Sequence, residues 1–152
     1  MIRQYFYWNA NIYLGFFRPR SSIDSEFVNI KLGDSCKASI GRNNGNDKYL
    51  ILDSNHCTDR DIFHELLHVI GLLHEHQRPD RNDYVVFNDS NIAYHPSRRI
   101  MYENFRKFKR IVDRMDLPYD GTSIMHYRYL QGSITDFPTL TSKVNYEQCL
   151  VF

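Results

Sequence analysis

Hydrophobic and polar residues alternate early in the chain, and this alternation predicts β-strands. Val28, Ile30 and Leu32 share one face of an extended segment, because successive side chains of a strand point to opposite faces. A short apolar run over 49–52 predicts a second strand, and the turn-rich segment GRNNGNDK leads into it. The stretch 35–40 is a candidate third strand.

The pattern becomes helical at Thr58. Thr58 and Asp61 have the spacing of a capping box, with Asp in place of the usual Glu, and Gly71 is a natural helix stop. The apolar positions in between are Ile62, Phe63, Leu66, Leu67, Val69 and Ile70. A strand-like run over 84–87 and a second helix over about 97–115 follow. Strands first and helices later, without βαβ alternation, predict an α+β fold.

Length and composition are those of an ordinary globular protein. The 152 residues, 42% hydrophobic and 24% charged, fit one domain with its own core. No regular pattern is evident from Gln131 onward. A net charge of +1 argues against a nucleic-acid partner, and no run approaches the roughly 20 apolar residues of a membrane span. We interpret the clustered basic residues as the solvated face of the second helix; they are Arg98, Arg99, Arg106, Lys107, Lys109 and Arg110.

The cysteines and a glycosylation sequon favour a secreted protein. Three cysteines, Cys36, Cys57 and Cys149, allow at most one internal disulfide. The triplet Asn88-Asp89-Ser90 is an acceptor sequon. Both features fit an oxidising, secretory setting, although residues 1–17 do not have the pattern of a signal peptide.

The stretch HELLHVIGLLHEHQRPDR, residues 64–81, contains the spacing of a metal site. His64 and His68 lie on one helix face, about 6 Å apart, where two neutral imidazoles can bind one zinc ion. Glu65 is placed to act on a metal-activated water. His74 is the candidate third ligand, but a straight helix would carry it about 15 Å along the axis from His64. The chain must therefore turn, and Gly71 permits the positive φ of such a turn.

A simpler interpretation makes His64 and His68 surface or core histidines. It leaves the third histidine, the glycine before it and the apolar helix unexplained, so we favour the metal site. We expect His76 to be an exposed loop residue, and His56 and His95 to be ordinary surface histidines.

The extended pattern HExxHxxGxxHExxRxDR resembles the astacin family of zinc endopeptidases, a branch of the metzincins. Asn82 stands where that family usually has Asp. The run 123–127, SIMHY, resembles the family's methionine turn, with Gly121-Thr122 in place of Tyr-Gly before it. The resemblance implies that Met125 lies beneath the metal without binding it. It also implies that Tyr127 can ligate zinc in the resting enzyme and then stabilise the transition state. Without the metal motif, core packing would be the preferred role for both side chains.

The resemblance extends to the residues before the helix. The segment 36–42 resembles the family's cysteine-to-GR segment, an edge strand along which peptide substrates pair. The family pattern implies a disulfide between Cys36 and Cys57, and it leaves Cys149 without its usual early partner. In the family, the residue matching Glu75 pairs with the amino terminus of the mature enzyme. The chain is shorter than a full catalytic domain of that family.

These observations predict one peptidase domain over 1–152 with a metzincin-like α+β fold. A mixed β-sheet and the zinc-binding helix would occupy about 12–74, and a less regular part with the methionine turn about 75–152. The expected function is a monomeric, secreted zinc endopeptidase acting on peptide or protein substrates. One Zn²⁺ would be held by His64, His68 and His74, with Glu65 and Tyr127 as its catalytic side chains. The alternative is a catalytically impaired zinc-binding or interaction module descended from such a protease. A purely structural zinc site is disfavoured, because only Tyr127 could complete four protein ligands.

Overall fold

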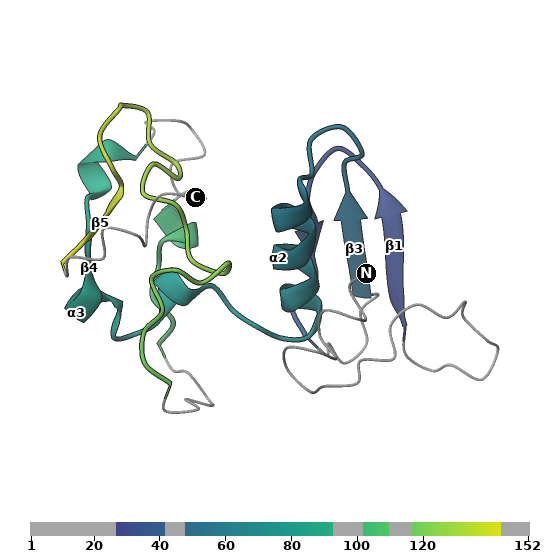
Figure 1. Ribbon diagram of the computed structural model, residues 1–152, viewed down its shortest axis with the longest axis horizontal. Helices are drawn as coiled ribbons and strands as arrows, with labels where there is room; N and C mark the ends of the chain where they lie inside the picture. The colour runs from purple at the N-terminus through teal and green to yellow at the C-terminus, as the bar shows by residue number, and fades with distance from the viewer. Residues whose placement is uncertain (1–26, 42–47, 93–101, 110–116, 144–152) are drawn as a thin grey trace.

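The computed structural model describes residues 27–41, 48–92, 102–109 and 117–143 (Figure 1). A mixed sheet has the strand order β1-β3-β2. In it β1 (Val28–Leu32) runs parallel to β3 (Lys48–Leu52), and β2 (Lys37–Ala38) pairs antiparallel with β3. The two strands and the candidate third strand expected from the alternation are therefore present, and β2 lies at an edge of this sheet.

The helix α2 (Asp59–Val69) contacts β3 and β2 (Figure 1). Its first turn is closed by the predicted capping box, in which the Thr58 hydroxyl accepts from the Asp61 N–H and the Asp61 carboxylate accepts from the Thr58 N–H. The apolar side of the helix packs through Leu66, which is 3% exposed, and Leu50 of β3 is 2% exposed. Burial of this kind stabilises a short helix more than propensity does.

The outer strand β1 differs from the expectation of one covered apolar face. Ile30 is 53% exposed and Leu32 is 82% exposed. Period-two alternation correctly predicted the strand, but it does not tell which face a neighbouring element covers.

The remaining described elements form a second group (Figure 1). After α2 the chain forms η1 (Glu75–Gln77), α3 (Arg81–Tyr84), β4 (Val85–Phe87) and η2 (Asp89–Asn91). The strand β5 (Leu140–Ser142) pairs antiparallel with β4. A buried apolar cluster holds this group together; its members are Val85, Ile92, Phe105, Tyr119 and Leu140.

Of the described residues in the predicted helix over 97–115, residues 102–104 are helical and confirm it, and residues 105–109 are not helical and contradict it. The Phe108 N–H donates to the Gln77 carbonyl at 2.8 Å, and the Gln77 side chain donates to the Arg106 carbonyl at 3.1 Å. The Phe108 N–H and the Arg106 carbonyl therefore bond to Gln77 of η1 and not to other residues of a continuing helix.

The described basic residues of this segment, Arg106, Lys107 and Lys109, are not helical, so the interpretation as a solvated helix face is wrong for these three. Arg106 pairs with Glu103 at 3.2 Å, and the Lys107 ammonium donates to the Pro79 carbonyl at 3.2 Å. Arg98, Arg99 and Arg110 lie outside the described residues. No described helix is long and apolar enough to cross a membrane.

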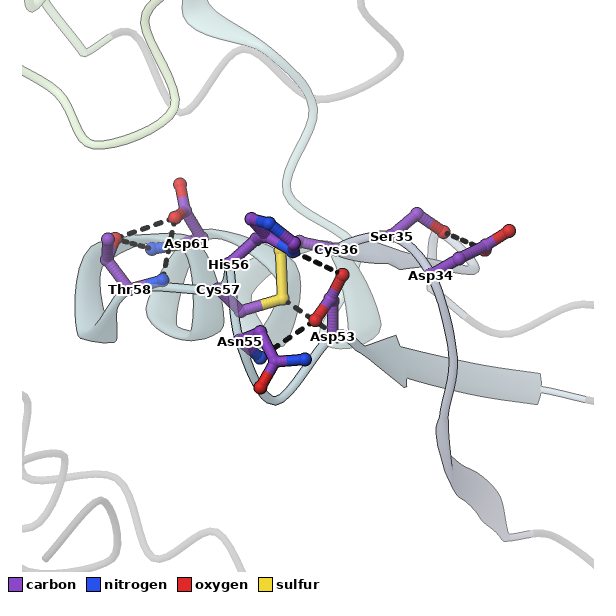
Figure 2. The surroundings of a disulfide bond; sticks show 9 residues. All are labelled: Asp34, Ser35, Cys36, Asp53, Asn55, His56, Cys57, Thr58 and Asp61. Carbon is purple, nitrogen blue, oxygen red and sulfur yellow. Dashed lines mark hydrogen bonds and ion pairs between the residues drawn. A yellow bond between two sulfur atoms is a disulfide. The ribbon is translucent and has the colours of Figure 1, made fainter.

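The expected disulfide joins Cys36 to Cys57 (Figure 2). Their Cα atoms are 5.8 Å apart, so the bond ties the start of β2 to the loop before α2. In the same loop, the exposed His56 ring lies 2.7 Å from an Asp53 carboxylate oxygen. His56 is thus a surface histidine as expected, while His95 and Cys149 lie outside the described residues.

Candidate active site

Three histidine side chains converge on one point. His64 and His68 project from successive turns of α2, and His74 is the residue before η1. The Nε2 atom of His74 lies 3.1 Å from that of His64 and 3.2 Å from that of His68. One ligand atom from each of the three residues lies within 4.8 Å of the others, which makes this a group able to hold a metal ion.

The turn that brings His74 back is centred on Gly71, where the sequence places it. Gly71 has a φ of 104°, a conformation that an L-residue with a side chain rarely adopts. Its N–H donates to the His68 carbonyl at 2.9 Å, and the Leu72 N–H donates to the Leu67 carbonyl at 3.0 Å. These bonds end the helix, and the chain leaves its axis before His74.

A second glycine supports this turn, and the sequence did not reveal its role. Gly41, with a φ of 58°, also donates its N–H to the His68 carbonyl, at 2.8 Å. A Cβ atom on Gly41 would lie 3.2 Å from the Gly71 Cα. The two backbones are in close contact, so the segment after β2 stabilises the turn after α2.

The hydrogen bonds of the three imidazoles fix their tautomers. Each Nδ1 atom faces an oxygen that can only accept. His64 faces the Ile124 carbonyl at 2.8 Å, and His68 faces the Leu72 carbonyl at 2.8 Å. His74 faces the Gln77 side-chain oxygen at 3.1 Å, and that amide is oriented by its own bond to a backbone carbonyl. The protons therefore sit on Nδ1, and three Nε2 lone pairs point toward one another, an arrangement that a shared cation stabilises.

Burial keeps these imidazoles neutral, as metal ligands must be. Desolvation is the main cause that lowers the pKa of His64 and of His68. It also lowers the pKa of His74, to about 4, helped by the neighbouring His68. At neutral pH all three rings are in the form that binds zinc.

Glu65 lies beside the histidines with its carboxyl largely withdrawn from water. The residue is 8% exposed, and burial raises the pKa of its carboxyl. A hydrogen bond from the Ala38 backbone on β2 acts in the opposite direction. The carboxyl thus faces the edge strand and the histidine cluster together.

The run 123–127 forms a tight turn against the segment that follows His74. The His126 N–H donates to the Ser123 carbonyl at 2.9 Å, and Met125 is 2% exposed. The Glu75 N–H donates to the Met125 carbonyl at 3.0 Å. Together with the bond from His64 to the Ile124 carbonyl, this places the turn directly beside the three histidines.

Tyr127 lies at the end of this turn, and its ring centroid is 5.0 Å from that of His74. Burial, and then the nearby Glu65 charge, raise the pKa of its hydroxyl. The phenol therefore remains protonated at neutral pH and can donate a hydrogen bond.

The expectation for His76 is wrong. The side chain is 0% exposed, and its ring stacks on the Tyr127 ring at 3.8 Å between centroids. Phe105 packs against it edge-on at 5.7 Å. The sequence placed His76 in an exposed loop, but its backbone belongs to the short 3₁₀ helix η1, and residues distant in sequence cover the side chain.

Glu75 is engaged within the described chain. Its Oε1 atom accepts from Arg78 at 2.9 Å and from the Asp120 N–H at 2.9 Å. Arg78 also binds Asp80 at 2.8 Å. This network fixes the segment after the third histidine to the loop that leads into the turn 123–127.

The three histidines, Glu65 and Tyr127 line one open cleft of about 660 Å³. One wall is β2, and α2 and the run 124–128 supply the others. Three cationic side chains lie along it: Lys37, Arg60 and Arg128.

Comparisons with known proteins agree on one family. The family model described as Astacin, a peptidase family, matches residues 6–151. The chain is 37% identical over 133 residues to Zinc metalloproteinase nas-14 of Caenorhabditis elegans, covering 85% of this chain and 25% of that protein. It is 38% identical over 113 residues to Astacin-like metalloprotease toxin 5 of Loxosceles gaucho, covering 73% of this chain and 57% of the toxin. The chain thus spans about a quarter of the length of its nas-14 relative.

A solved structure gives the same result for the fold. High choriolytic enzyme 1, a hatching enzyme zinc-protease from Oryzias latipes, superposes with a TM-score of 0.71 at 30% identity, covering 84% of this chain and 60% of that one. The expected metzincin-like α+β fold is confirmed by this likeness. Zinc is the metal that both the relatives and the three neutral imidazoles indicate. The chain belongs to the astacin family of zinc metallopeptidases.

Proposed function

We propose that this chain is the catalytic part of a zinc endopeptidase, with residues 1–152 acting as one peptidase domain. The observation that carries the proposal is the convergence of three Nε2 atoms. The Nε2 atom of His74 lies 3.1 Å from that of His64 and 3.2 Å from that of His68. The Nδ1 proton of each ring is already engaged in a hydrogen bond, so each Nε2 lone pair is free to bind a metal. His64, His68 and His74 would hold the zinc ion. Zinc bound in this way acts as a Lewis acid and lowers the pKa of a water toward about 7.

Glu65 would take the proton from the attacking water and deliver it to the leaving amine. Its carboxyl is buried and its pKa is raised, so the carboxylate is a stronger base than an exposed one. The Ala38 N–H holds the carboxyl against β2. This bond would keep the base at one place while the proton is exchanged.

Tyr127 would stabilise the developing oxyanion. Its hydroxyl stays protonated because burial raises its pKa, so it remains a donor. A donor of this kind contributes about 3 kcal/mol to transition-state stabilisation in other hydrolases. Met125, which is buried, would lie beneath the metal and support it without binding it.

The substrate would be a peptide or protein bound along β2. This strand is at the edge of the mixed sheet and lines the cleft, so an extended peptide could pair with its main chain. The relatives include a hatching enzyme and a toxin. By analogy, this chain would act as a monomer outside the cell, where its disulfide persists.

The test is Glu65→Gln in purified protein. Wild type should cleave a casein-like substrate, lose activity to a zinc chelator and recover it with zinc. Glu65→Gln should bind one zinc ion per chain yet turn over about 10²–10⁴-fold more slowly. The control is Glu103→Gln, which removes a surface partner of Arg106 and should leave turnover unchanged.

Two outcomes would contradict the proposal in different ways. Full activity in Glu65→Gln would remove Glu65 from the mechanism. Zinc binding by a wild-type chain that cleaves nothing would instead support an impaired zinc-binding module.

A further inference from the structure

His76 is buried against Tyr127, the side chain that the proposed mechanism uses to stabilise the oxyanion. It belongs to η1, two residues after His74, and its side chain is fully buried. Its ring lies almost parallel to that of Tyr127, with centroids 3.8 Å apart and 22° between the planes. The proposed function gives His76 no role.

The His76 ring is anchored at one end and unpaired at the other. Its Nε2 atom lies 3.0 Å from the Asn104 carbonyl, which can only accept, so Nε2 carries the proton. Its Nδ1 atom is then a buried acceptor that finds no partner in the described part of the chain. Such an orphan group lowers the stability of the folded state. A hydrocarbon ring of the same shape would pack here without leaving a buried acceptor unpaired. We therefore look for a contribution of the imidazole other than stability.

What the imidazole adds is a fixed orientation. The bond to Asn104 sets the plane of the His76 ring, and the Tyr127 ring lies flat against that plane. Phe105 meets the Tyr127 ring edge-on, at 5.4 Å and 82°. The Tyr127 ring thus stacks on the His76 ring, and Phe105 packs against both of them, with its centroid 5.4 Å from Tyr127 and 5.7 Å from His76.

Arg81 links the backbones of His76 and Phe105. This residue is 5% exposed, and its guanidinium donates to the His76 carbonyl at 3.1 Å and to the Phe105 carbonyl at 2.6 Å. Hydrogen bonds from Arg81 and from His76 to the segment 102–109 therefore hold the His76 and Phe105 rings against Tyr127.

We propose that His76 is a positioning residue, whose anchored ring holds the Tyr127 hydroxyl where the oxyanion of the substrate develops. This inference rests on the proposed role of Tyr127. A misplacement of about 1 Å is enough to weaken a preorganised donor severely. The Nδ1 atoms of the three metal-binding histidines are held by Ile124, Leu72 and Gln77 and not by His76, so loss of the stack should affect turnover more than zinc or substrate binding.

The experiment is a double-mutant cycle between His76 and Tyr127 in the zinc-loaded protein. His76→Phe keeps a flat ring but removes both nitrogens, the anchoring Nε2–H and the orphan Nδ1. We expect kcat to fall about 10-fold or more, with KM and the zinc dissociation constant changed less than about 2-fold. The melting temperature should stay the same or rise, because the orphan acceptor is gone. His56→Phe, which changes an exposed histidine, is the control and should have no effect.

The second arm of the cycle separates positioning from general structural damage. Tyr127→Phe removes the hydroxyl, so adding His76→Phe should then change kcat by less than about 2-fold. Effects that multiply in the double variant would overturn the proposal, as would wild-type kcat in His76→Phe.

A third measurement does not need turnover. In metal-free protein with labelled tyrosine rings, NMR should show the Tyr127 ring protons shifted upfield by the stacked imidazole. His76→Ala should remove that shift, and an unchanged spectrum would refute the stack in solution. If the wild type proves inactive, the proposed function fails, whereas this measurement still decides whether His76 places Tyr127.

Discussion

Gly71 shows how one backbone position can determine whether a metal site forms. Only the turn at φ 104° lets the chain leave the α2 axis early enough for His74 to meet His64 and His68. Gly41 presses against the same point from the segment after β2. The site therefore depends on two residues that contribute no side chain to it.

Gly71→Ala should separate this role from ordinary stability. A side chain at such a φ costs about 1–3 kcal/mol, and the turn would relax by moving His74. We expect the zinc affinity, measured by competition with a chromophoric chelator, to fall at least about 10-fold. Gly132→Ala is the matched control, because Gly132 also has a positive φ, 72°, but belongs to the turn closed by the Ser133 N–H and the Leu130 carbonyl and not to the turn after α2. It should lower the melting temperature and leave the zinc affinity unchanged. Equal zinc affinities in the two variants would show that the turn is not what places His74.

At the scale of single residues, local spacing identified the chemistry but not the packing. The four-residue interval put His64 and His68 on one helix face, and the glycine pointed to His74. His76 was misjudged because the Tyr127 and Phe105 rings that bury it come from 51 and 29 positions further along the sequence. No local pattern encodes such a contact.

At the scale of elements, the helix α2 was predictable because its signals are local. Its cap, apolar stripe and terminating glycine all lie within the helix or one turn of it. The strand β5 has three residues and exists through pairing with β4, about 50 residues away. The helix expected over 97–115 does not continue over 105–109 for a similar reason, since Gln77 binds the backbone at Arg106 and Phe108. Short elements that depend on distant partners are not visible in a sequence window.

The capping box of α2 gives a prediction with a defined pH dependence. Thr58→Ala should lower the free energy of unfolding by about 1 kcal/mol at neutral pH. The hydrogen bond from the Thr58 hydroxyl is the main cause that lowers the pKa of Asp61 below 3.8. Because the folded pKa is the lower one, this contribution is present above pH 3.8 and is lost as the pH falls through the folded value.

Thermal unfolding between pH 7 and pH 2.5 would check this dependence. The gap between wild type and Thr58→Ala should narrow on acidification, and Thr58→Ser, which keeps the box, should follow wild type throughout. A gap that stays constant with pH would mean that the Asp61 carboxylate does not act through Thr58.

At the scale of the whole molecule, the site is where the two groups of elements meet. The histidines of α2 belong with the mixed sheet, but the His64 ring is held by the Ile124 carbonyl. The Glu75 N–H in turn binds the Met125 carbonyl. A metal at this point would add a further tie between the part of the chain before Gly71 and the part after it, so metal binding and folding should be coupled.

Zinc should therefore raise the thermal stability of the chain, and the gain should grow with the logarithm of the zinc excess over its dissociation constant. A ligand that binds only the folded state at 100 times its dissociation constant stabilises by about 2.7 kcal/mol. For about 150 residues that corresponds to a rise of roughly 5–10 °C in melting temperature. A chelator should reverse the shift.

Two variants test where the zinc binds. Glu65→Gln should keep the shift, because Glu65 is not one of the three side chains that could hold the metal. His74→Ala should lose most of it, since two histidines on one helix turn remain without the third. The same shift in His74→Ala as in wild type would mean that zinc stabilises the chain from some other site.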